Sequence, residues 1–127
     1  MDECTFCRVL RGELPSTVIH ANDLFVAILN LSGYTDGHIL ILPKKHHETT
    51  ATFSDAEKLA FFEMVDAVEV IHKERYGAKG TRVWWNIGRA AGQMQIHMHA
   101  HAFPFRPDEI ADGLRERFAE NMRESAG

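Results

Sequence analysis

The sequence predicts an α+β domain in which an antiparallel sheet of about five strands carries one long helix, followed by a C-terminal helix. Two observations predict this class. Short runs of β-branched and apolar residues lie on both sides of a single inserted helical segment, and the 127-residue chain fits one domain. We expect residues 1–127 to form a single domain, with residues 1–105 as its core and 106–127 as a helical extension.

The elements of the N-terminal third are short. Apolar Val9 and Leu10 before Gly12 indicate a brief helical turn that the glycine ends. Two β-branched segments follow at 17–20 and 24–29, and residues 21–23 form a polar turn between them. Residues 38–42 are a nearly continuous apolar run, which is typical of a strand buried on both faces, and Pro43 is expected to stop it.

The long helix has clear start and stop signals. Ser54 and Glu57 form a capping box, and Gly77 is placed to end the helix after Tyr76. Its apolar residues recur at three- and four-residue spacing over a wide face, so one part can cover a sheet and leave room for a partner helix. A strand is expected at 81–86. Asp108 is expected to cap the final helix.

Three histidines with strict two-residue spacing lie within residues 93–103. In a strand, His97, His99 and His101 would lie on one face, with His97 and His101 roughly 13 Å apart. Rings spread so far cannot share one zinc ion, so we expect different roles among nucleophile, proton donor and metal ligand. The alternative is a solvated polar face of an amphipathic strand.

Composition limits the class of protein. The formal net charge of −4 and a pI near 6.0 argue against a nucleic-acid backbone binder, whereas a small nucleotide remains compatible. The acidic N-terminus has no signal-peptide pattern and no apolar run reaches membrane-span length, so we expect a cytoplasmic protein that does not interact with a membrane. Cys4 and Cys7 could be a redox pair, two unremarkable thiols or half of a zinc site.

The stretch from His97 to Phe103, three histidines alternating with apolar residues and then two apolar residues, resembles the motif of the histidine-triad family. Upstream motifs resemble its nucleotide-binding branch, in the bacterial zinc-containing type, and the resemblance runs from Cys4 to about Phe105. These motifs are Cys4-x-x-Cys7, Gly12-Glu13-Leu14-Pro15, Gly37-His38 through Pro43-Lys44-Lys45-His46, Asn86-Ile87-Gly88 and Gly92-Gln93. The resemblance implies the histidine-triad fold.

The resemblance also implies an activity. His99 would attack the α-phosphate of a purine nucleotide, and water would resolve the nucleotidyl-histidine intermediate. His101 would donate a hydrogen bond to the phosphate or the leaving group, while Asn86 and Gln93 would hold the non-bridging oxygens. Expected substrates are phosphoramidates, adenylylated amines or dinucleoside polyphosphates.

Positions that line the base pocket in this family are occupied by apolar residues, which could equally be plain core. They are Phe6, Val9, Ile28 and Leu31. Asn30 stands where the family has an acidic residue on the ribose hydroxyls, and Met94 stands where close members often have a serine near the phosphate. Both departures favour the rival hypothesis, a nucleotide-binding module or scaffold with little catalysis.

Bacterial members of the family imply a structural zinc ion and no catalytic metal. The implied ligands are Cys4, Cys7, His46 and His97. His97 is thus both a member of the triad and a ligand. The family further implies a homodimer through the long helix and its neighbouring strand. We expect His38 to make a structural hydrogen bond, histidines 20, 47 and 72 to lie at the surface, and Lys44-Lys45 to be a solvated pair that could also steer an anion.

Overall fold

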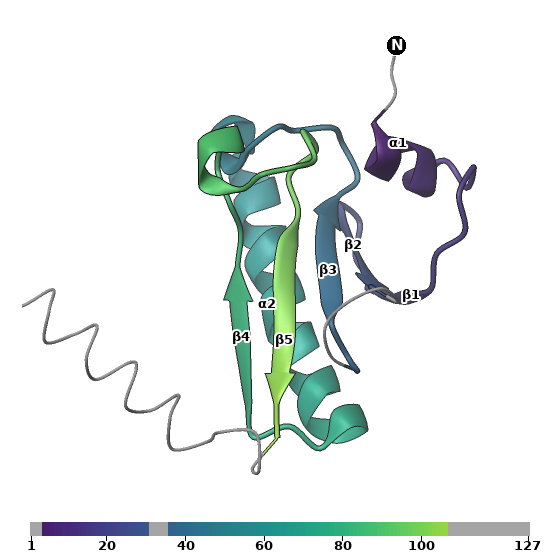
Figure 1. Ribbon diagram of the computed structural model, residues 1–127, viewed down its shortest axis with the longest axis vertical. Helices are drawn as coiled ribbons and strands as arrows, with labels where there is room; N and C mark the ends of the chain where they lie inside the picture. Colours follow the sequence, from purple (N-terminus) through teal and green to yellow (C-terminus); the bar gives the residue numbers. More distant parts are fainter. Residues whose placement is uncertain (1–3, 31–35, 107–127) are drawn as a thin grey trace, which may run out of the picture.

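The computed structural model describes residues 4–30 and 36–106, which form one five-stranded sheet with a helix on each side (Figure 1). The helices and strands are α1 (Thr5–Leu10), β1 (Val18–Ala21), β2 (Phe25–Leu29), β3 (Ile39–Pro43), α2 (Asp55–Tyr76), β4 (Gly80–Trp84) and β5 (Ala100–Phe105). Short 3-10 turns lie at Thr50–Thr52 and Arg89–Ala91. The predicted C-terminal helix lies outside the described residues.

The sheet has the strand order β1-β2-β3-β5-β4, and all four strand pairings are antiparallel. The predicted α+β class and the five-stranded antiparallel sheet are therefore confirmed. Strand β3 lies at the centre and is buried along its whole length, which fits its continuous apolar sequence. The strand ends at Pro43, the residue that we expected to stop it, and Pro43 itself is its last residue.

Helix α2 packs along one face of the sheet (Figure 1). Ser54 and Glu57 form the predicted capping box, and Gly77 ends the helix in the left-handed conformation with φ of 65°, which glycine adopts without a steric penalty. The core between helix and sheet contains Met64 and Val68 from α2 and Ile39 and Ile41 from β3, all fully buried. Deleting a side chain of this size from such a core typically costs about 2–5 kcal/mol.

Helix α1 covers the opposite face of the sheet. Partly buried Phe6, Val9 and Leu10 pack there against a second, smaller cluster formed by Val26, Ile28, Leu40 and Leu42. None of the six residues of α1 is fully buried. The α2 face of the sheet is thus more completely buried than the α1 face.

The triad histidines differ from the predicted continuous strand. Strand β5 begins only at Ala100, so His97 and His99 lie in the loop before it and only His101 lies in the strand. The predicted alternation of sides holds. Met98, Ala100 and Ala102 belong to the core under α2, and the histidine rings lie on the α1 side.

The outer surface of α2 retains large apolar side chains. Leu59 is 68% exposed and Phe62 is 59% exposed, although both belong to the apolar pattern of the helix. Among the described residues, no helix has the length and apolar character needed to cross a membrane.

Candidate functional site

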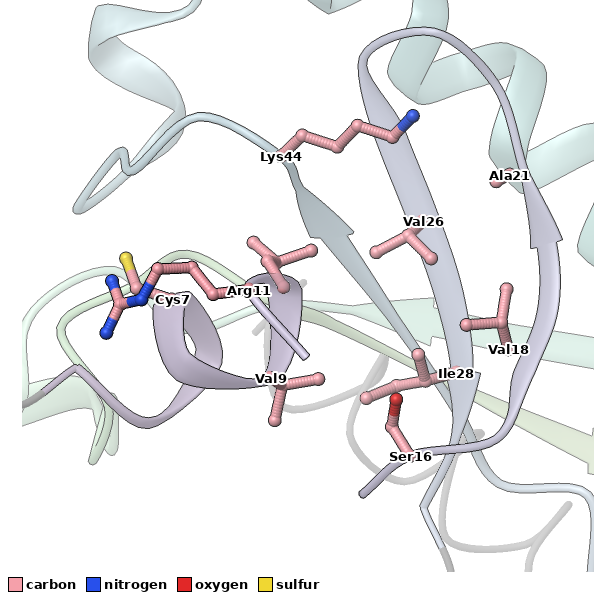
Figure 2. Close-up of a pocket in the computed structure, with 10 residues that line it drawn as sticks. Cys7, Val9, Arg11, Ser16, Val18, Ala21, Val26, Ile28 and Lys44 are labelled. Carbon is pink, nitrogen blue, oxygen red and sulfur yellow. The ribbon is translucent and has the colours of Figure 1, made fainter. Parts of the chain in front are cut away.

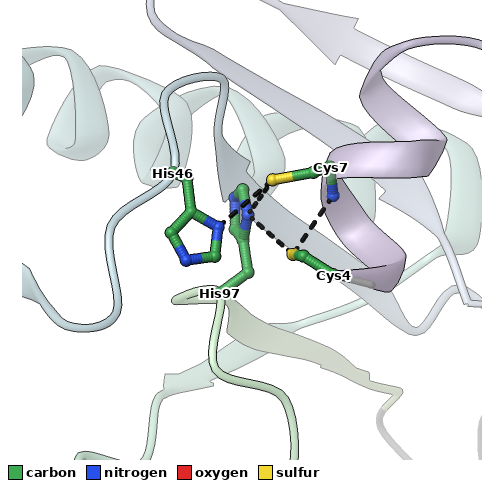
Figure 3. A group of neighbouring side chains, drawn as sticks. All are labelled: Cys4, Cys7, His46 and His97. Carbon is green, nitrogen blue, oxygen red and sulfur yellow. Dashed lines mark hydrogen bonds between the residues drawn. The ribbon is translucent and has the colours of Figure 1, made fainter. Parts of the chain in front are cut away.

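Four predicted metal ligands converge from three separate segments (Figure 3). Cys4 and Cys7 come from the start of α1, His46 from the loop after β3, and His97 from the loop before β5. One ligand atom from each side chain lies within 4.8 Å of the other three. The Sγ atom of Cys7 lies 3.1 Å from Nδ1 of His46 and 3.5 Å from Nδ1 of His97. Two sulfurs and two imidazole nitrogens match the ligand set of tetrahedral zinc.

The inner ligand is prepared as a neutral donor. The Nε2–H group of His97 donates to the carbonyl oxygen of Pro43 at 2.9 Å, which leaves the Nδ1 lone pair towards the two sulfurs. Burial, ahead of any other cause, lowers the pKa of His97 to about 4, so the ring is neutral at neutral pH. Metal-bound histidines commonly donate their second nitrogen to a backbone carbonyl, so the arrangement fits zinc.

His47, next to the ligand His46, is buried rather than at the surface as predicted. Its Nε2–H donates to Glu57 at 2.7 Å, and its Nδ1 accepts from the Thr52 hydroxyl at 2.8 Å. Burial alone would raise the pKa of Glu57, but hydrogen bonds from Ser54 and His47 outweigh it and lower that pKa. The backbone N–H of Met98 donates to the His47 carbonyl at 2.7 Å, so the loops that carry both ligand histidines are joined.

His99 has the opposite tautomer to His97. Its Nδ1–H donates to the carbonyl oxygen of His97 at 3.0 Å, because a carbonyl can only accept. In the neutral ring the Nε2 atom is therefore the unprotonated one, as nucleophilic attack requires. The ring of Phe6 lies against His99 with centroids 5.0 Å apart, so α1 fixes one side of the imidazole.

His101 is joined to His38, which in turn contacts Asn30. Nε2 of His38 lies 3.0 Å from Nδ1 of His101, and Nδ2 of Asn30 lies 3.3 Å from Nδ1 of His38. The expected structural hydrogen bond of His38 is thus present, and its partner is a triad histidine. The ring of His38 also stacks on Phe103 with centroids 3.9 Å apart. The ring of Trp84 stacks on both His101 and Phe103.

The apolar residues predicted for base binding come together on the histidine side of the sheet. Phe6, Val9 and Ile28 belong to the second apolar cluster, and Leu31 lies outside the described residues. A cavity of about 630 Å³ opens between α1 and the β1–β2 hairpin (Figure 2). Its lining includes Val9 and Ile28, with the side chains of Arg11 and Lys44 as its cationic groups.

The strand register connects this cavity with the histidines. Ile28 pairs with Leu40, Leu40 pairs with His101, and His101 pairs with Trp84, so these residues form one row across the sheet. Adjacent strands lie about 4.8 Å apart, which places Ile28 roughly 10 Å from His101. None of the triad histidines lines the cavity itself, which lies beside them on the same side of the sheet.

The predicted phosphate-binding amides differ in their freedom. The Nε2 group of Gln93 donates to the carbonyl oxygens of Glu48 at 2.6 Å and Gln95 at 3.0 Å, and its Oε1 accepts from the Gly88 N–H. A phosphate contact from Gln93 would require one of these bonds to break. Within residues 4–30 and 36–106, the side chain of Asn86 makes one hydrogen bond, a long one of 3.4 Å to the Gly92 carbonyl.

Three buried residues of functional interest lie outside the set predicted from sequence. His47 and Glu57 support the metal cluster, and His72 donates from Nε2 to the Gly37 carbonyl at 2.7 Å while its Nδ1 accepts from the Thr81 hydroxyl. Burial lowers the pKa of His72. The periodic position of His72 on the buried side of α2, next to Ile71, was the available signal.

Comparison with known proteins bears directly on this arrangement. A family model described as the HIT domain matches residues 11–108. The chain belongs to the histidine-triad (HIT) family. An uncharacterised HIT-like protein of Methanocaldococcus jannaschii is 36% identical over 102 residues, which cover 80% of this chain and 78% of that protein.

Two relatives of this HIT protein are named for reactions of adenosine nucleotides. Adenosine 5'-monophosphoramidase of Schizosaccharomyces pombe is 29% identical over 87% of this chain and 80% of its own length. Adenylylsulfatase of Arabidopsis thaliana is 30% identical over 81% of this chain and 52% of its own length. HIT family membership therefore supports a nucleotide hydrolase in the broad sense.

A solved structure supports the metal assignment. The zinc-bound histidine-triad family protein of Mycobacterium smegmatis aligns over 98% of both chains with a TM-score of 0.75 and 26% identity. Together with the Cys4, Cys7, His46 and His97 cluster, this structure indicates that the HIT protein described here has a zinc-type site.

Proposed function

We propose that this HIT protein is a hydrolase or nucleotidyl transferase that acts on the α-phosphate of purine nucleotides through a nucleotidyl-histidine intermediate. One observation carries the proposal. The Nδ1–H of His99 is held by the His97 carbonyl, which leaves an unprotonated Nε2 on the face that also carries His101 and the apolar cluster.

In the proposed reaction, the Nε2 lone pair of His99 forms a bond to the α-phosphorus while the bond to the leaving group breaks. The leaving group departs with that electron pair and takes a proton from solvent. Water then forms the new P–O bond and loses a proton as the P–N bond breaks and returns its electron pair to His99. A hydrogen bond from His101 stabilises the charge that develops during both steps.

The row from Ile28 to His101 supports a position for the nucleoside. A base on the apolar cluster beside Phe6 and Val9 would lie roughly two strand spacings from His101, or about 10 Å. Asn86 would then hold a non-bridging oxygen, and Gln93 would position the loop. Lys44 at the cavity would attract the anion.

The names of two relatives support the choice of bond. One is named for a phosphoramidate and the other for an adenylyl sulfate, so their leaving groups differ while an adenosine 5'-phosphate is common to both. We therefore include phosphoramidates, adenylylated amines and dinucleoside polyphosphates as substrates of this protein.

The proposal assigns zinc a structural role. Four protein ligands would close a tetrahedral site, and a closed site has no open position for substrate. Zinc would join α1 to the two histidine loops, and the phosphate chemistry would need no metal. Because Cys4 and Cys7 do not form a disulfide with each other, a reducing compartment such as the cytoplasm fits them.

We further propose a homodimer through α2 and β4. Strand β4 is an edge of the sheet, and Leu59 and Phe62 present apolar surface on the adjacent helix. The formal net charge of −4 argues against nucleic acid as a partner. The concentration dependence of mass in sedimentation, compared with a Phe62→Ser variant, tests the dimer.

The decisive test is intact-mass analysis after rapid quenching with an adenosine phosphoramidate at mildly alkaline pH, where a phosphohistidine bond survives. We expect an added nucleotidyl mass in the unaltered protein and none in His99→Ala. An adduct that persists in His99→Ala would contradict the assigned nucleophile. No adduct and no product, with nucleotide binding intact, would favour the binding module, with Asn30 and Met94 as its sequence signals.

A further inference from the structure

A line of three polar side chains leads from β2 to the triad. Asn30 follows β2, His38 precedes β3, and His101 lies in β5. We propose that Asn30 sets the tautomer of His101 through His38, so that neutral His101 carries its proton on Nε2. The inference rests on the proposed function, in which His101 donates a hydrogen bond to the phosphate or the leaving group.

The direction of the hydrogen bonds follows from their donors. An amide N–H cannot accept, so Nδ2 of Asn30 donates to Nδ1 of His38 across 3.3 Å. A neutral imidazole has one proton, and that of His38 must then lie on Nε2. This Nε2–H donates across 3.0 Å to Nδ1 of His101, which leaves the proton of His101 on Nε2.

Packing holds the three groups in register. The backbone N–H of Asn30 donates to the His38 carbonyl at 2.8 Å, so the two residues are joined twice. The His38 ring is 2% exposed and stacks on Phe103, with its plane 20° from that ring. Trp84 stacks on His101 at 5.3 Å from the β4 side. Rotation of either imidazole would therefore break both a hydrogen bond and ring contacts.

The surroundings keep both rings neutral. Burial lowers the pKa of His38 to about 4, and the nearby His101 and His72 contribute in the same direction. Burial, followed by the neighbouring His99, lowers the pKa of His101. On the β4 side, the guanidinium of Arg82 lies over the Trp84 ring, 5.1 Å from its centroid. A neutral His101 can donate only from the nitrogen that carries its proton, so its tautomer determines whether it can assist.

Replacing the amide by a carboxylate would reverse the line. An aspartate at position 30 can only accept when ionised, so it would draw the His38 proton to Nδ1. Nε2 of His38 would then accept from Nδ1–H of His101. In the free protein, where no ribose hydroxyls engage the carboxylate, Nε2 of His101 would lose its proton and with it the capacity to donate. Exchange of the Asn30 NH₂ group for oxygen would thus change the tautomer of His101, which lies two hydrogen bonds away.

Long-range ¹H–¹⁵N correlation spectra of the full chain test the proposal at mildly alkaline pH, without substrate. His38→Gln and His101→Gln spectra assign the two rings. In the unaltered protein we expect a protonated Nε2 and a bare Nδ1 on both His38 and His101. A proton on Nδ1 of His101 would overturn the proposal. The tautomers themselves are measured on the unaltered protein.

The Asn30→Asp variant tests the cause. We expect the proton to move to Nδ1 on both His38 and His101, while His72, which donates to the Gly37 carbonyl, keeps its tautomer as an internal control. If His38 and His101 keep their tautomers in a variant whose His72 signals show the native fold, Asn30 does not set them. The spectra do not depend on turnover. If the tautomers of His38 and His101 contradict this inference, the covalent-adduct test of the proposed function is unaffected. If no covalent adduct forms, the spectra still report the two tautomers.

Discussion

His97 and His99 lie two residues apart on the same side of the sheet, yet each uses a different nitrogen. His97 donates from Nε2 to the Pro43 carbonyl and turns Nδ1 to the cysteines, whereas His99 donates from Nδ1 to the His97 carbonyl and keeps Nε2 unprotonated. A different backbone acceptor for each ring thus makes His97 suited to metal binding and His99 suited to nucleophilic attack.

The two regions also differ in enclosure. His97 is fully buried among segments from α1, the β3 loop and the β5 loop, while the His99 ring is half-buried beneath Phe6. A closed region suits a structural ion, and a partly open region suits a substrate. If the two regions have separate roles, variants in each should change different properties.

The largest effect is expected for His99→Ala. Loss of the nucleophile should lower kcat by about 10³-fold or more, while nucleotide affinity changes little. The zinc content should remain at the wild-type level, because His99 is not among the four clustered ligands. Single-turnover kinetics, nucleotide titration and elemental analysis measure the three quantities.

A matched control for His99→Ala is His20→Ala, at an exposed histidine of β1. Loss of zinc from His99→Ala, or equal turnover in the two variants, would contradict separate roles for the metal region and the His99 region.

The next effect is expected for Cys4→Ser in the closed region. Elemental analysis of protein purified without chelator should give about one zinc per chain for wild type and none for the variant. The free energy of unfolding should fall by about 4 kcal/mol or more, since loss of a structural metal removes its binding energy from folding. Chemical denaturation measures the change.

Thr5→Ser, at the exposed neighbouring residue, is the control for Cys4→Ser. Wild-type protein isolated without zinc would rule out the metal assignment.

A smaller effect is expected from the dependence of stability on pH through His38. The pKa of His38 is about 4 in the folded protein, against an ordinary value of 6.5, so the unfolded chain binds more protons between these values. Stability should therefore fall as pH decreases through this window, by up to about 3 kcal/mol from this ring.

Denaturation at several pH values, compared between wild type and His38→Gln, isolates the contribution of His38. The variant should show a flatter pH dependence than the wild type, and His20→Gln, at an exposed histidine, is the matched substitution control. Parallel slopes for wild type and His38→Gln would contradict the effect of burial on the His38 pKa.

The smallest effect is expected for Met94→Ser, which tests the departure from close family members. Met94 is 75% exposed, so the substitution should leave the fold intact. One added hydroxyl contact is worth about 0.5–1.5 kcal/mol, which predicts a two- to tenfold rise in kcat/KM. Ile96→Ser, at an exposed apolar residue of the same loop, should leave kcat/KM unchanged, and an equal rise in both variants would argue against a specific contact.

Local patterns predicted much of the architecture. The unbroken apolar run of β3 indicated its central, fully buried position, and Ser54 with Glu57 marked the start of α2. The two-residue spacing of the histidines also predicted their common side, because side chains of an extended chain alternate even where no ladder hydrogen bonds form.

Other features depended on contacts that local patterns do not contain. We expected His47 and His72 at the surface, but each has two polar partners in the interior, so the ring nitrogens of both buried side chains are hydrogen-bonded. The histidine strand was expected from residue 93, whereas loop bonds such as that from Met98 to the His47 carbonyl replace the ladder before Ala100.

The sequence by itself determined the class of the domain, the family motifs and the residue types at the site. Only the tertiary structure decided which nitrogen of each imidazole is protonated. The acceptor for His97 lies 54 residues away at Pro43, and the partner of His101 lies 63 residues away at His38. The physical reason is that both imidazole nitrogens can donate or accept, so a buried ring takes the tautomer that its packed neighbours require.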